Sequence, residues 1–123
     1  MNFLTKTYAL ALFILCLSQN IQAENIAIME SKSFHPLQVM DDNWLAVAQN
    51  MGHQATIYNQ GTLDDITNFD NADVLIISSG LIDLPSNRQA TIQAFIESGR
   101  SVYIQSEFLL FHPGNVTFQN IIN

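Results

Sequence analysis

The chain has 123 residues, of which 48% are hydrophobic and 12% are charged, and its formal net charge is −7. This apolar content argues against a disordered chain, which has too little apolar surface to offset the entropy lost on folding. Four Lys and Arg residues against 11 Asp and Glu also disfavour nucleic-acid and anionic-membrane partners, because those partners bind clustered basic side chains.

Residues 1–23 match the pattern of a secretory signal peptide. Lys6 gives a weakly basic start, residues 9–17 form an unbroken apolar run, and Ala23 is a small residue where a signal peptidase would cut. The apolar run is far shorter than the roughly 20 residues that span a bilayer, so we expect cleavage rather than an uncleaved membrane anchor. The protein is therefore expected to be exported, to the periplasm or the extracellular space, with no stable anchor.

Residues 24–123 are predicted to form a single α/β domain. Cys16, the one cysteine of the chain, leaves with the signal peptide, so the domain has no disulfide and no thiolate metal site. The three histidines lack the spacing of metal ligands, and we expect no metal and no cofactor. A chain of about 100 residues can bury enough surface to fold on its core alone.

The first half of this domain alternates strand, helix and strand patterns. An apolar run predicts a strand at 25–29. Apolar residues at helical spacing then predict a helix that Asp41 or Asp42 N-caps and that Gly52 ends in a left-handed conformation. The β-rich, alternating residues 54–58 predict the second strand.

The second half repeats this alternation. Residues 63–69 predict one or two helical turns, with Asp64 and Asp65 near the positive end of the helix dipole. Residues 74–78 form a short apolar run that predicts a buried third strand. Residues 101–105 predict a fourth strand, parallel to the third.

The helix between the third and fourth strands is predicted at 86–98. Ser86 and Gln89 fit a capping box, in which each side chain bonds the backbone N–H of the other residue. Gly99 is expected to end this helix. Apolar residues at helical spacing within 116–122 predict the start of one more helix.

Strands that alternate with helices favour a parallel sheet with helices on both faces. We therefore predict a small three-layer, flavodoxin-like α/β fold of about four parallel strands, in the order 2-1-3-4 when the strands are numbered along the chain. The strands at 54–58 and 101–105 then form the two edges of the sheet. Ligands of such folds bind beyond the carboxyl ends of the strands, at the switch point between the first and third strands.

Residues 72–105 also carry a resemblance to a known family. The segments ADVLIISSG at 72–80, LPS at 84–86, IQAFIESG at 92–99 and SVYIQ at 101–105 follow one another in a characteristic order. In this order they resemble the N-terminal half of the class I glutamine amidotransferase-like superfamily, with its trehalose-utilisation-type domains nearest. Relative to that family, the chain looks truncated to about half of a domain.

The resemblance implies a nucleophile elbow after the fourth strand, which usually carries a cysteine. The matching residues include Ser106 and Glu107 but no cysteine, and the family's catalytic histidine comes from a later segment. The candidate catalytic residues are therefore Ser106 as a nucleophile or Glu107 as an acid–base group. The alternative is that both are polar residues that close the strand.

A second set of candidates flanks the switch point, where backbone N–H groups could bind an anion or a carbonyl oxygen. The candidate ligand-binding residues are Glu30, Ser31, Ser79 and Gly80. The alternative is an ordinary loop in which glycine permits a tight turn.

These observations favour an exported α/β domain without catalytic activity, which acts as a binding or interaction module. The alternatives are a small secreted hydrolase that uses Ser106 or Glu107, and a non-functional fragment of a longer protein. An open fourth strand favours self-association or a protein partner at that edge. The residues expected there are Val102, Tyr103, Ile104 and Phe108.

Overall fold

The computed structural model describes residues 22–31, 40–79, 82, 84–105 and 121. The predicted signal peptide and the predicted helix at 116–122 lie almost wholly outside these residues. Among the described residues, no helix combines the length and the hydropathy that are needed to cross a membrane.

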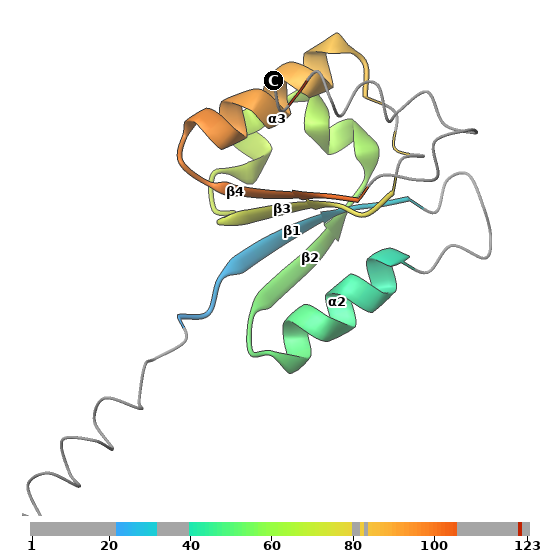
Figure 1. Ribbon diagram of the computed structural model, residues 1–123, viewed down its shortest axis with the longest axis vertical. Helices are drawn as coiled ribbons and strands as arrows, with labels where there is room; N and C mark the ends of the chain where they lie inside the picture. The colour runs from blue at the N-terminus through green and yellow to red at the C-terminus, as the bar shows by residue number, and fades with distance from the viewer. Residues whose placement is uncertain (1–21, 32–39, 80–81, 83, 106–120, 122–123) are drawn as a thin grey trace, which may run out of the picture.

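Four parallel strands form one sheet in the described part of the chain, in the order β2-β1-β3-β4 (Figure 1). They are β1 (Asn25–Met29), β2 (Gln54–Tyr58), β3 (Val74–Ile77) and β4 (Ser101–Ile104). The two central strands, β1 and β3, carry the most buried residues, as expected for strands covered on both faces. The predicted α/β, flavodoxin-like fold and its strand order are confirmed.

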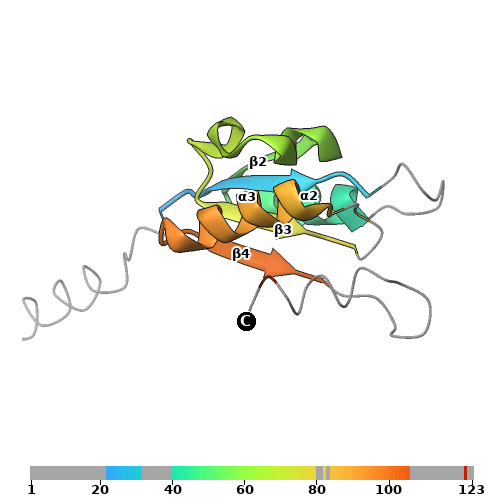
Figure 2. The ribbon, with the colours of Figure 1, turned by 90° about the horizontal axis from the view of Figure 1, so that it is seen from above.

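Helices cover both faces of this sheet and give three layers (Figures 1 and 2). One face holds α2 (Met40–Asn50), which packs on β1 and β2. The opposite face holds α3 (Ser86–Glu97) and two short 3₁₀ helices, η1 (Gln60–Asp64) and η2 (Ile66–Phe69). The prediction of one or two helical turns at 63–69 is therefore right in kind, although the turns are 3₁₀ and begin earlier.

The main core lies on the α3 face of the sheet. Residues paired across parallel strands share a face, so Met29 and Ile77 point to the same side. There they meet apolar side chains of α3 and the 3₁₀ helices. The buried cluster comprises Ala27, Met29, Leu63, Phe69, Ala72, Leu75, Ile77, Ile82, Leu84, Ile92, Phe95 and Ile121.

The α2 face is covered less completely. Ile28 and Ile76 are buried on this face, and Trp44 of α2 reaches across to Tyr103 on β4, with ring centroids 4.9 Å apart. Tyr103 nevertheless remains 44% exposed. This face is therefore open beside the edge strand β4.

Both predicted glycine stops are confirmed. Gly52 after α2 has a φ of 88° and Gly99 after α3 has a φ of 83°, which is the left-handed conformation that glycine adopts without a steric cost.

The predicted capping box of α3 is wrong. The N-cap residue is Pro85, so Ser86 is the first helical residue. Gln89 is then the fourth helical residue, whereas a capping box needs the glutamine at the third. The Gln89 Nε2 group donates instead to the Leu84 carbonyl at 2.8 Å. The start of the helix is thus held by an amide side chain that bonds the chain just before it.

Asp64 and Asp65 act at the junction of η1 and η2. Arg88 Nε of α3 donates to Asp64 Oδ1 at 2.8 Å, and this bond lowers the pKa of the Asp64 carboxyl. Asp65 caps η2 by accepting the Thr67 N–H at 2.9 Å, which lowers the pKa of the Asp65 carboxyl. The acids therefore hold the 3₁₀ helices in place through specific bonds.

These lowered pKa values predict loss of stability in acid. A carboxyl whose pKa is lower in the folded state stabilises that state above its unfolded pKa, near 3.8 here, and this contribution is lost as the pH falls through the folded pKa. Thermal midpoints measured from neutral pH to below pH 3.8 should therefore fall in acid, and the fall should be shallower in Asp64→Asn. Parallel curves for the variant and the wild type would contradict this assignment.

Candidate functional site

The carboxyl ends of β1 and β3 lie side by side, because Met29 pairs with Ile77 in the sheet. The structure therefore brings together three of the four predicted ligand-binding residues: Glu30 and Ser31 follow β1, and Ser79 lies two residues after β3. Gly80, the fourth, is outside the described residues. Ser31 and Ser79 are both completely buried.

A buried serine–aspartate pair organises this edge of the sheet. The Ser31 N–H donates to Asp41 Oδ2 at 3.3 Å, and the Ser31 hydroxyl donates to Asp41 Oδ1. Both residues are 0% exposed. Asp41 lies in the first turn of α2, where the positive end of the helix dipole stabilises a carboxylate.

This pairing corrects the prediction that Asp41 or Asp42 N-caps the helix. The helix begins at Met40, so Asp41 already lies inside its first turn, and its carboxylate accepts bonds from the strand-end serine. The sequence analysis did not select Asp41 as a site residue. The sequence signal that could have identified Asp41 is its position: it is an acid at the start of the first helix after the first strand.

The remaining polar groups at this edge also make structural bonds. The Ser78 hydroxyl donates to the Met29 carbonyl at 3.4 Å and so links β3 to β1. The Glu30 N–H donates to the Tyr58 carbonyl at 2.8 Å, and the Glu30 carbonyl accepts the Gln60 amide at 3.1 Å. Hydrogen bonds at this edge therefore join three strands and α2, through the Glu30 backbone rather than its carboxylate.

The chemistry that this edge can perform is limited by the groups that are present. His53 accepts the Glu24 N–H at 3.2 Å beyond the opposite ends of the strands. No group of three or more His, Cys, Asp or Glu side chains among the described residues could hold a metal ion. Among the described residues of this edge, the Ser31 hydroxyl and the Asp41 carboxylate are already bonded to each other, and no histidine lies beside them to activate a nucleophile.

The candidate catalytic residues Ser106 and Glu107 lie outside the described residues, as does Phe108. The last described residue before them is Gln105, whose N–H donates to the Ile77 carbonyl at 2.9 Å. This bond extends the β3–β4 pairing to the end of the strand.

β4, for which an interaction is predicted, has no strand on its outer side in the described part of the chain. A groove of about 370 Å³ runs beside it on the α3 face. Ile96 and Arg100 form one wall, and Val102 and Ile104 of β4 form the other. Arg100 is fixed there, because its Nη1 donates to the Phe69 carbonyl at 2.6 Å and its guanidinium lies 3.9 Å from the Phe95 ring centroid.

Comparisons with protein-family models, with curated proteins and with solved structures found no match to this chain.

Proposed function

We propose that this protein is an exported, non-catalytic interaction module that associates with a second copy of itself through the outer edge of β4. Motifs at 72–105 support a relationship to glutamine amidotransferase-like domains, and residues 1–23 support export. The absence of catalysis is supported by the buried edge network, in which Ser31 and Asp41 bond one another. The observation that carries the proposal is that β4 has no strand on its outer side among the described residues and has apolar surface on both of its faces.

The outer side of β4, where the described residues supply no strand, presents backbone groups in a regular pattern. The Ser101 N–H donates to the Asp73 carbonyl and the Gln105 N–H donates to the Ile77 carbonyl. The backbone groups of alternate residues along β4 therefore point toward β3. Val102 and Ile104, which lie between them, direct their N–H and C=O groups to the outer side. An added strand can pair with these groups, as edge strands commonly do.

Side chains on both faces of β4 suit such a strand. On the α3 face, the groove beside Ile96 offers apolar surface to every second residue of an added strand. On the α2 face, the exposed ring of Tyr103 offers contact to the residues between them. A two-fold pairing of β4 with β4 places the same residues on both partners and joins two sheets into one.

Replacing Ile96 with lysine tests this proposal. Ile96 is 38% exposed on α3 and lines the groove, so a lysine there places like charges against each other across a two-fold interface at little expense to the fold. We expect the wild type to run as a dimer at high micromolar concentration in size-exclusion chromatography with light scattering, and Ile96→Lys to run as a monomer.

Met51→Lys is the matched control. Met51 is 64% exposed and follows α2, which packs on β1 and β2 rather than on β4. This variant should remain a dimer. A monomeric wild type, or equal dissociation of the two variants, would rule out association through β4.

A further inference from the structure

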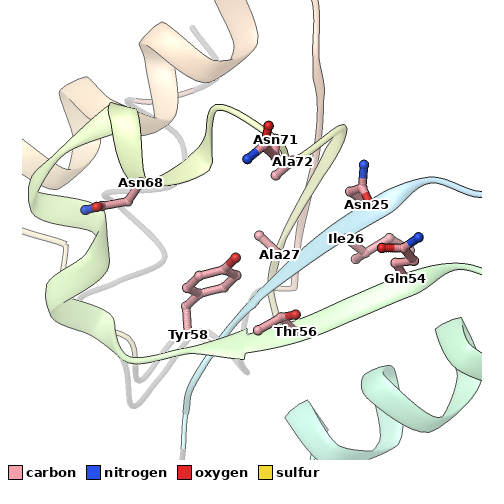
Figure 3. A pocket seen from close by; sticks show the side chains of 9 residues that line it. All are labelled: Asn25, Ile26, Ala27, Gln54, Thr56, Tyr58, Asn68, Asn71 and Ala72. Atoms are coloured by element: carbon pink, nitrogen blue, oxygen red, sulfur yellow. The ribbon is translucent and has the colours of Figure 1, made fainter.

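A surface pocket of about 220 Å³ lies on the α3 face, beside the β2 edge of the sheet. It is bounded by β1, β2 and the segment that joins η2 to β3 (Figure 3). It is separate from the β4 edge, and it shares only Tyr58 with the described carboxyl-end network. The pocket exists because η2 is only four residues long, so the α3 face of β2 is left partly uncovered. Thr56 of β2 is consequently exposed there.

Uncharged polar side chains dominate this pocket. Asn25 and Gln54 are paired across β1 and β2, and Asn71 faces them from the segment after η2 (Figure 3). Thr56 and Tyr58 of β2 add two hydroxyl groups. None of the described residues that line the pocket carries a charge.

These groups have hydrogen-bonding capacity to spare. The carboxamides of Gln54 and Asn71 and the hydroxyls of Thr56 and Tyr58 make no hydrogen bond to another described residue. The Tyr58 ring is held in place against Phe69, with centroids 5.6 Å apart. Figure 3 shows the Tyr58 hydroxyl between β2 and the segment that carries Asn71, and these polar residues line the same pocket.

We propose that this pocket binds a neutral, polyhydroxylated ligand, of the chemistry of a sugar ring or a cyclic polyol. A carboxamide presents an acceptor and a donor side by side, which matches two neighbouring hydroxyl groups that each donate and accept. The volume is below the roughly 300–1,000 Å³ of pockets for drug-sized ligands, as expected for a single ring.

The lack of charge in the pocket separates this ligand class from others. Anionic ligands such as nucleotides or sugar acids need basic partners, and the pocket has none. Asp73 accepts the N–H of the lining residue Asn25 at 2.8 Å, and its negative charge makes the approach of an anion less favourable. A neutral ring that carries hydroxyl groups would contact only uncharged hydrogen-bond donors and acceptors in this pocket.

Nuclear magnetic resonance titration of the protein with D-glucose and myo-inositol tests the proposal. We expect saturable shifts of the Gln54 and Asn71 side-chain amide signals, and weaker or absent binding of glucuronate. Cellotriose added in parallel distinguishes a free monosaccharide from the end of a glycan chain, because a glycan ligand binds more tightly than its single sugar.

Three variants make the test specific. Gln54→Ala and Thr56→Val each remove a hydrogen-bonding group at an exposed position, and each should weaken binding of the tightest probe about threefold to tenfold. Gln93→Ala removes an exposed amide on α3 and should bind like the wild type. Absence of saturable shifts with all three neutral probes, or equal binding by wild type and Gln54→Ala, would overturn the proposal.

Discussion

Replacing Phe95 with alanine is expected to lower the free energy of unfolding by about 3–5 kcal/mol. Phe95 is 0% exposed and joins three parts of the molecule. Its ring meets the Phe69 ring edge-on, with centroids 6.4 Å apart, and the Arg100 guanidinium covers its face. The substitution therefore leaves a cavity and removes two aromatic contacts at once.

A loss of this size is a large part of the roughly 5–15 kcal/mol that stabilises a typical domain. We expect Phe95→Ala to be unfolded or close to it at 37 °C, as measured by denaturant unfolding with Trp44 fluorescence. Phe95→Leu, which refills most of the volume, should recover about half of the loss.

Ile96→Ala is the neighbouring control for this experiment. Ile96 follows Phe95 in the same helix but is 38% exposed, so its truncation should cost less than about 1 kcal/mol. Equal losses at the two positions would show that α3 is not held through the Phe95 face.

The fold could be predicted where local signals agreed with the tertiary structure. The bounds of β1 and β2 match the sequence prediction residue for residue, because short apolar or alternating runs are flanked there by polar residues. Gly52 and Gly99 marked the helix ends, because only the local backbone conformation decides those positions. The strand order followed from the rules for βαβ connections.

Local reasoning failed for two different reasons. The capping box at Ser86 was one residue out of register, because the adjacent Pro85 takes the cap position. The turns at 63–69 became 3₁₀ helices that are held by Arg88 of α3, 24 residues after Asp64. That second bond is not visible in a window of local sequence.

The candidate site could also be predicted only in part. Strand ends predicted where polar residues would gather, and Ser31 and Ser79 lie there. The bonding of buried Ser31 was not predictable, because it depends on Asp41, whose carboxylate accepts bonds from the strand end across to α2. The polar pocket at Gln54 and Thr56 was also missed, since it forms only because the 3₁₀ helices leave β2 uncovered.

Replacing Asp41 with alanine is expected to lower the free energy of unfolding by about 1–3 kcal/mol, because the Ser31 N–H and hydroxyl then lose their acceptor inside the protein. Ser31→Ala removes only the hydroxyl bond and should cost less. In the double variant the losses should not add, with a coupling energy of about 0.5–3 kcal/mol between the two sites. Chemical denaturation of the four proteins measures all of these values.

Asn43→Ala separates the pair from the general effect of truncating a polar side chain near the start of α2. Asn43 is exposed on the same helix, so its loss should change stability by no more than about 0.5 kcal/mol. If Asp41→Ala were as mild as Asn43→Ala, the serine–aspartate pair would not be what holds α2 to β1. A buried acid that costs nothing to remove at this switch point would instead be a candidate for ligand binding, and the purely structural interpretation of the edge would have to be abandoned.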